Sequence, residues 1–173
     1  DESLDASVVW KALLASGQLT EYDTSVVFYS GDVLEGRLRS LTGSFSGWEV
    51  MHTVAIKTAP HEAILRRIVE LGHGLEAASY EEVVLAAHVG APPSRITYNS
   101  PVKTRAEIRR CCDRYPGLRL NANSLEELTR IPQGHPLDLG LRINPLVDPG
   151  SSSALYDVSG THSKFGVPLS ERD

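Results

Sequence analysis

The sequence lacks the features that mark secreted disulfide-rich proteins and membrane proteins. It has only two cysteines, Cys111 and Cys112, and neighbours in sequence cannot cross-link distant parts of a chain. No run approaches the length of about 18 apolar residues that a membrane-spanning helix needs. Residues 1–5 lack the basic and apolar regions of a signal peptide. We therefore expect a cytoplasmic protein with no membrane partner.

Basic residues are too few for a protein that binds nucleic acid. The 17 Lys and Arg residues are outnumbered by 22 Asp and Glu residues, which gives a net charge of −5, whereas nucleic-acid-binding domains usually carry a basic surface. The six histidines show no metal-ligand spacing with cysteines or acidic residues, so we predict no metal site. Neither a Gly-x-Ser-x-Gly nucleophile elbow nor a Walker phosphate loop occurs. With 41% hydrophobic and 23% charged residues, the composition is that of an ordinary globular protein.

What the sequence does contain is a recurring pair of signals, a short apolar stretch followed by a helix start. Three helix starts read Ser/Thr-x-x-Glu, at residues 79–82, 104–107 and 124–127. This is the capping-box pattern, in which the hydroxyl accepts a hydrogen bond from the third residue's N–H and that residue's carboxylate reaches back. Three such signals, each just after a strand-like stretch, predict that strands and helices alternate.

The alternation extends over most of the chain. The expected strands are 50–56, 74–78, 95–98, 118–121 and 137–143, and the expected helices are 60–71, 79–89, 104–115 and 124–131. Units of about 20 to 25 residues indicate right-handed crossovers and a parallel sheet, so the fold class is α/β. Outside this region we expect helices at 8–15 and 32–41, a strand at 25–29, a turn at 42–47 and an irregular segment at 144–161.

Polar residues at the carboxyl ends of the expected strands are the candidates for chemistry, because ligands of parallel α/β proteins bind there. They are Lys57, Glu76, Asn99, Asn121 and Arg142. If the strands are neighbours in one sheet, all five side chains approach the same rim.

Lys57 and Arg142 are the most informative of these candidates. Lys57 follows the apolar residues 54–56, and we expect it on the last rung of a buried strand. Desolvation would lower its pKa, and a neutral amine is what Schiff-base chemistry requires; the alternative is a lysine that emerges into solvent. Arg142 lies within an apolar run and needs a buried acceptor. A structural salt bridge, for example to Glu76, is the alternative to a role at a ligand.

Five motifs resemble those of the fold-type III pyridoxal-phosphate decarboxylases, which comprise the diaminopimelate, ornithine and arginine decarboxylases. The motifs are His-Thr-Val-Ala-Ile-Lys-Thr at 52–58, Gly-Leu-Glu-Ala-Ala-Ser at 74–79 with Glu82, Asn-Ser-Pro-Val-Lys at 99–103, Leu-Arg-Ile-Asn-Pro at 141–145 and Ser-Lys-Phe-Gly-Val-Pro at 163–168. Their order and intervals agree with that family from about residue 25 to the end.

The resemblance implies an alanine-racemase-like (β/α)8 barrel of the TIM type, of which residues 31–173 form the first half. Residues 1–30 would be an arm that joins a C-terminal β domain. The implied cofactor is pyridoxal 5′-phosphate, bonded covalently to Lys57, with Glu76 and Arg142 beside it. Lys164 would lie near the interface of a homodimer. In that family the phosphate-binding loop and the partner of the pyridine nitrogen come after the matched region, so we interpret this chain as a fragment, inactive alone.

The activity that the resemblance implies is decarboxylation of an amino acid. A diaminopimelate-like substrate is the first expectation, and a basic amino acid is the second. Two alternatives stay open, namely an alanine-racemase-like or cofactor-carrier protein on the same barrel, and a regulatory relative without catalysis. Val54 and Ala59 stand where related enzymes often have Tyr and Asn, which keeps the regulatory alternative open.

Overall fold

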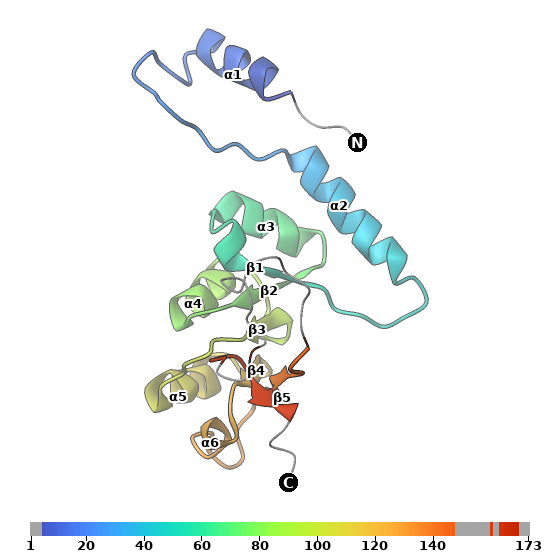
Figure 1. The fold of residues 1–173 in the computed structure, drawn as a ribbon, viewed down its shortest axis with the longest axis vertical. Helices are drawn as coiled ribbons and strands as arrows, with labels where there is room; N and C mark the ends of the chain where they lie inside the picture. Colours follow the sequence, from blue (N-terminus) through green and yellow to red (C-terminus); the bar gives the residue numbers. More distant parts are fainter. Residues whose placement is uncertain (1–4, 148–159, 161–162, 170–173) are drawn as a thin grey trace. The chain divides into compact units, whose positions relative to one another are not determined.

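The computed structural model describes residues 5–147, 160 and 163–169. The chain divides into two compact units, residues 1–48 and 49–173, and each is described by itself (Figure 1). The expected boundary at residue 30, which refers to an arm and a β domain, stays a prediction. No helix among the described residues has the length and apolar character needed to cross a membrane.

Over its described residues, 5–48, the first unit holds two helices, and both were expected. Helix α1 (Ala6–Ala15) begins after Asp5, whose side chain accepts a hydrogen bond from the Ser7 N–H at 2.9 Å. Helix α2 (Gly31–Ser44) runs three residues beyond its predicted end and takes up part of the expected turn. The predicted strand at 25–29 is wrong, because these residues pair with no other strand in the described part of the chain. An extended segment is a strand only where a neighbour satisfies its backbone groups.

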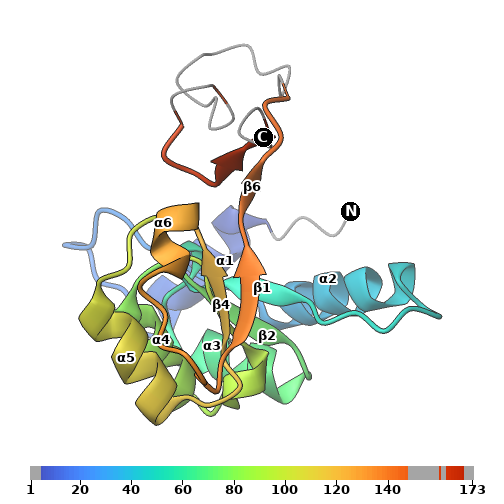
Figure 2. The same cartoon turned by 90° about the horizontal axis from the view of Figure 1, so that it is seen from below.

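The second unit contains a five-stranded sheet in which every neighbouring pair is parallel, as predicted. Its strands lie in chain order: β1 (Thr53–Ala55), β2 (Gly74–Ala77), β3 (Ile96–Tyr98), β4 (Arg119–Ala122) and β5 (Asp138–Leu141). A two-residue strand β6 (Ile143–Asn144) continues from β5 beyond the sheet (Figure 2) and pairs with β7 (Val167–Pro168). Sequential parallel strands joined by helices are the arrangement of part of a (β/α)8 barrel.

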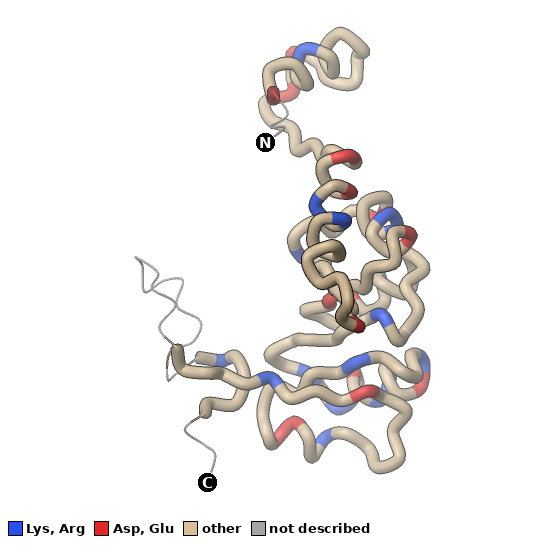
Figure 3. The backbone as a smooth tube through the Cα atoms, turned by 90° about the vertical axis from the view of Figure 1, so that its right-hand side faces the viewer, with Lys and Arg blue, Asp and Glu red and all other residues tan. Residues whose placement is uncertain are grey.

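The helices of the second unit lie along one side of the sheet (Figure 1). They are α3 (Glu62–Glu70), α4 (Tyr80–His88), α5 (Arg105–Arg114) and the short α6 (Leu125–Leu128), with 3-10 turns η1 (Ile56–Thr58) and η2 (Pro93–Arg95). Acidic and basic residues are interspersed along this unit (Figure 3).

The core of the second unit consists of apolar side chains from the strands and the helices. Its fully buried strand residues are Leu75, Ala77, Ile96, Tyr98, Leu120 and Ala122, and its buried apolar α-helix residues are Leu65, Ile68, Tyr80, Val83, Ala86, Ile108 and Cys111. Because side chains alternate along a strand, the residues between these, Glu76, Thr97 and Asn121, belong to the opposite face. The sheet therefore has an apolar helix-facing side and a polar side.

The three predicted helix caps form, but only one is a complete capping box. At the start of α5, Thr104 Oγ1 accepts from the Glu107 N–H at 3.2 Å and the Glu107 carboxylate accepts from the Thr104 N–H at 2.6 Å. In the other two caps, the serine hydroxyl accepts its hydrogen bond, but the glutamate carboxylate accepts from the N–H of the residue before the cap. These contacts join Glu82 to the Ala78 N–H at 2.7 Å and Glu127 to the Asn123 N–H at 3.2 Å.

Candidate active site

The register of the sheet places several of the predicted site residues at one edge and on one face. Since all five strands are parallel, the segments that follow them leave the sheet at the same edge. Glu76 pairs in register with Ala55 on one side and with Thr97 on the other. The polar face at this carboxyl edge is therefore the candidate active site.

Lys57 lies just after β1 and is exposed, so the prediction that it occupies the last rung of a buried strand is wrong. The strand ends at Ala55, and residues 56–58 form a 3-10 turn. Two hydrogen bonds close this turn, from Thr58 Oγ1 to the Ala55 carbonyl at 2.7 Å and from the Ala59 N–H to the Ile56 carbonyl at 3.0 Å. Ile56 takes the fully buried position instead. The alternative, a lysine that emerges into solvent, is what the structure shows.

Arg142 is half-buried and stacks on an aromatic ring. Its guanidinium carbon lies 4.3 Å from the centre of the Phe165 ring, a distance within the range of a cation–π contact. Among the described residues no carboxylate pairs with Arg142. The proposed salt bridge between Arg142 and Glu76 is therefore not formed, although both residues are described.

The two asparagines at this edge differ in their surroundings. The Asn99 side-chain oxygen is buried and has no hydrogen-bond partner in the described part of the chain. Buried acceptors are nearly always satisfied, so this atom can accept a hydrogen bond from a bound group. The Asn121 side chain lies against Gly140, where an added Cβ would overlap its oxygen. Gly140 thus leaves room for Asn121 on the polar face.

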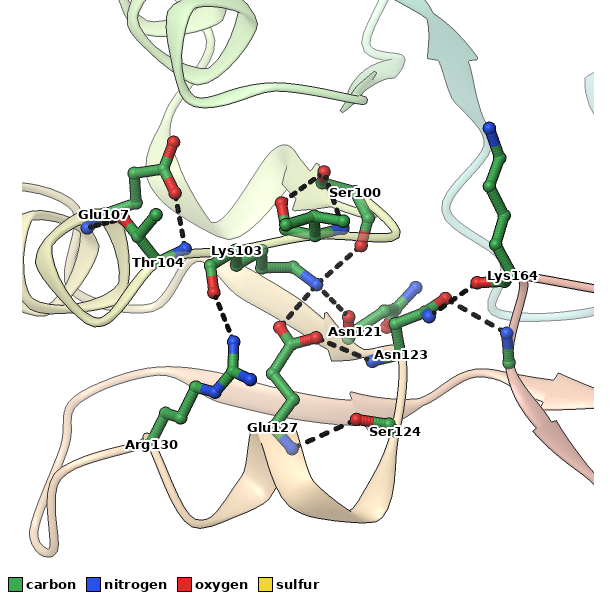
Figure 4. A network of polar contacts seen from close by, with 12 residues as sticks. Ser100, Lys103, Thr104, Glu107, Asn121, Asn123, Ser124, Glu127, Arg130 and Lys164 are labelled. Atoms are coloured by element: carbon green, nitrogen blue, oxygen red, sulfur yellow. Dashed lines mark hydrogen bonds and ion pairs between the residues drawn. The ribbon is translucent and has the colours of Figure 1, made fainter.

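The buried lysine of this edge is Lys103, which ends the Asn-Ser-Pro-Val-Lys motif and was not predicted as a site residue. Its side chain is fully buried, and its ammonium forms an ion pair with Glu127 at 2.7 Å (Figure 4). Burial lowers the pKa of Lys103, while the Glu127 carboxylate opposes that shift. Glu127 is the carboxylate of the third capping pattern, so its sequence signal was read only as a helix start.

Lys164, the residue placed by resemblance at a dimer interface, is exposed. Its backbone carbonyl accepts a hydrogen bond from the Asn123 side-chain amide at 2.8 Å, and its ammonium lies 5.1 Å from the centre of the Phe165 ring. The role of Lys164 at an interface stays a prediction. Most of the irregular segment expected at 144–161 lies outside the described residues.

Comparison with known proteins identifies one family over most of the chain. The sequence profile of the pyridoxal-binding domain of pyridoxal-dependent decarboxylases matches residues 32–173. Diaminopimelate decarboxylase of Zymomonas mobilis is 30% identical over 155 residues, which cover 85% of this chain and 36% of that protein. Antizyme inhibitor 2 of Xenopus laevis is 31% identical over 153 residues, which cover 88% of this chain and 31% of that protein.

Solved structures show the same fold. The crystal structure of diaminopimelate decarboxylase from Helicobacter pylori, complexed with L-lysine, superposes with a TM-score of 0.78 at 23% identity. The match covers 89% of this chain and 40% of that one. The chain thus spans between 31% and 40% of the length of these three relatives.

Proposed function

Because the chain belongs to the pyridoxal-dependent decarboxylase family, through the pyridoxal-binding domain, we propose that it supplies part of the active site of an amino-acid decarboxylase. The observation that carries this proposal is the exposed amine of Lys57 at the carboxyl edge of a parallel sheet. Relatives named as diaminopimelate decarboxylases favour diaminopimelate as the substrate. A basic amino acid is the second choice, as in the relative named ornithine decarboxylase.

The described residues fit the reactive part of pyridoxal phosphate. Lys57 has a primary amine that can bond to an aldehyde, and it would hold the cofactor. Glu76, on the polar face, and Arg142 would lie beside it. The buried Asn99 oxygen without a partner is an acceptor for a donor on the cofactor or the substrate. When bound, the cofactor supplies the electron sink that allows the substrate carboxylate to leave as carbon dioxide.

The chain's own residues would position the reacting groups, shield the polar face from water and transfer protons. The 3-10 turn fixes the backbone of Lys57, whose Nζ can carry a proton to or from the substrate. Arg142 would contribute a positive charge beside the cofactor, carried on a planar guanidinium. The fully buried Leu75 and Ile96, on the helix-facing side, exclude water from behind the polar face.

Trapping by borohydride tests the role of Lys57. The sequence holds four lysines, and of these Lys11, Lys57 and Lys164 are exposed. After incubation with pyridoxal phosphate and reduction, peptide mass mapping should find Lys57 labelled well before Lys11 and Lys164. Lys57→Ala should remove the visible absorbance of the bound cofactor, whereas Lys11→Ala should keep it. Equal labelling of the three exposed lysines would overturn the proposal.

A regulatory relative without catalysis is the second candidate. It is favoured by the 31% identity to a protein named for inhibition, Antizyme inhibitor 2. For such a protein, Lys57 would react no faster than the other exposed lysines. Should Lys57 be preferred, carbon dioxide release from diaminopimelate is compared with interconversion of its isomers, using the whole enzyme of which we interpret this chain as a fragment, and this comparison separates a decarboxylase from a racemase-like enzyme.

A cytoplasmic homodimer with Lys164 near its interface also belongs to this proposal. Lys164 is exposed and therefore accessible to a second copy of the chain. Sedimentation equilibrium should show a dimer, and Lys164→Glu should weaken it while Lys11→Glu leaves it unchanged. A monomer at all concentrations would exclude the homodimer.

A further inference from the structure

The Asn123 side chain binds a segment that is about forty residues away in the sequence. Its Nδ2 donates to the Lys164 carbonyl at 2.8 Å, and its Oδ1 accepts from the Gly166 N–H at 3.0 Å (Figure 4). A side-chain amide carries both a donor and an acceptor, so one residue makes both contacts. Because the two partners flank Phe165, Asn123 clamps the backbone on both sides of that ring.

A buried ion pair fixes the position of Asn123. Glu127 accepts from the Asn123 N–H through Oε2 at 3.2 Å and pairs with Lys103 through Oε1 at 2.7 Å. The Lys103 ammonium also donates to the carbonyls of Ser100 and Asn121, each at 2.8 Å. All three ammonium protons are therefore committed to the protein, and none remains for a ligand. The pair joins the loop that follows β3 to helix α6, and Asn123 lies in the short loop between β4 and that helix.

The clamped segment in turn holds Arg142 in two ways. The Phe165 ring lies 4.3 Å from the Arg142 guanidinium carbon, and the Val167 N–H donates to the Arg142 carbonyl at 2.8 Å. Gly166 permits this close approach, since a Cβ there would lie 2.9 Å from the Asn144 nitrogen. Arg142 is thus bound to the segment by its backbone and its side chain, and no described carboxylate holds it.

We propose that Asn123 is a positioning residue for Arg142, acting through the segment of residues 164–167 and the Phe165 ring that it carries. Every link from the Lys103–Glu127 pair to Asn123, to the segment and to the guanidinium is a contact given above. The consequence for the cofactor rests on the proposed function, in which Arg142 lies beside pyridoxal phosphate. The geometric part of the proposal, that Asn123 fixes the position of the Arg142 side chain, does not rest on the proposed function, because it concerns the protein without a cofactor.

Nuclear magnetic resonance of the cofactor-free protein tests the geometric part. The Arg142 Nε–H signal, identified by its loss in Arg142→Lys, should be displaced by the ring current of Phe165, and Phe165→Leu should remove the displacement. Asn123→Ala should remove at least half of it. The matched control, Ser79→Ala, deletes the N-cap hydroxyl of α4 and should leave it intact.

Retention of the full displacement in Asn123→Ala, with the core methyl signals of Leu120 unchanged, would overturn the proposal. If that variant does not fold, Asn123→Gln replaces it, since its amide is kept but displaced by one methylene. Asn123→Gln should shift the Arg142 signal part of the way towards its position in Phe165→Leu. An unshifted signal in Asn123→Gln would equally overturn the proposal.

Trapping of pyridoxal phosphate on Lys57 tests the consequence for the cofactor. Asn123→Ala and Phe165→Leu should each raise the concentration needed for half-labelling by roughly 10-fold, as loss of an orienting contact does. The double variant should need no higher concentration for half-labelling than either single variant, because both substitutions act on one chain of contacts. Additive losses would exclude the route through Phe165. If wild-type Lys57 is not labelled but the ring-current effects hold, the proposed function fails and the positioning role stands.

Discussion

Two lysines at the same edge of one sheet have opposite surroundings. Lys57 follows β1 and is exposed, whereas Lys103 follows β3, is fully buried and donates all three of its ammonium protons to the protein. The residue expected to be desolvated is in solvent, and the residue that is desolvated serves structure. An apolar strand before a lysine therefore does not decide whether the lysine is buried. The conformation of the turn that follows the strand decides it.

The difference also separates two tasks. An amine that is to react with a ligand must be accessible, and Lys57 meets that condition. A buried ammonium must be paired, and Lys103 meets this second condition through Glu127 and two backbone carbonyls. We therefore expect chemistry on the β1 side of the edge and stability on the β3–β4 side.

The largest expected effect is the loss of the buried pair. Lys103→Met leaves the Glu127 carboxylate buried without its partner and should destabilise the protein by about 3–5 kcal/mol. Lys57→Met removes an exposed side chain and should change stability by no more than about 0.5 kcal/mol. Urea unfolding followed by circular dichroism measures both changes in stability. Circular dichroism is chosen over tryptophan fluorescence because the two tryptophans, Trp10 and Trp48, belong to the other compact unit.

A double variant serves as the control for this prediction. Lys103→Met combined with Glu127→Leu removes both charges and should recover much of the stability, since an apolar pair can replace a buried ion pair. Equal stabilities for Lys103→Met and Lys57→Met would mean that the two lysines do not differ as the structure indicates.

The next effect concerns the clamped segment on the β4–β5 side. Gly166 has a φ of +78°, and an added Cβ would lie 2.9 Å from the Asn144 nitrogen and the Ile143 carbonyl carbon. Gly166→Ala should therefore cost about 2–3 kcal/mol, from the left-handed conformation and the backbone clash. Gly90 is the matched control, because it has a φ of +98° and nothing within 4 Å. Gly90→Ala should cost only about 1 kcal/mol in the same unfolding experiment. Equal costs would indicate that the segment can move away.

The parallel sheet could be predicted because its signals are local. Apolar stretches and hydroxyl caps act within a few residues, so the starts of α4, α5 and α6 follow their caps at Ser79, Thr104 and Ser124. The strand predicted at 25–29 does not form, since local signals cannot show whether a segment has a partner and a strand exists only with one. The family motifs identified the segments that lie at the carboxyl edge of the sheet, but they did not indicate which residues of these segments contact one another.

The contacts of the site depend on residues that are far apart in the sequence. Glu127 and Lys103 are 24 positions apart, and the Asn123 amide meets a segment 41 to 43 positions away. No periodicity carries such information. Arg142 illustrates the same limit, because its need for a partner was predicted, with a salt bridge and a ligand as the alternatives, whereas the structure places an aromatic ring against it.

The smallest expected effect is a pH dependence that originates at the amino ends of β1 and β2. His73 precedes β2 and is buried, and its ring centre lies 6.1 Å from that of His52, which precedes β1. Burial, then His52 and Arg95, lower the pKa of His73 in the folded protein. The unfolded chain takes up a proton at about pH 6.5, which the folded protein accepts only at lower pH. Stability is therefore unaffected above that pH and falls as the pH drops below it.

Urea midpoints between about pH 7.5 and 5.5 measure this dependence. The unfolding midpoint should decline less steeply with acidification in His73→Gln than in the wild type. His61→Gln, at an exposed position, should decline as the wild type does. An unchanged slope in His73→Gln would assign the acid sensitivity elsewhere.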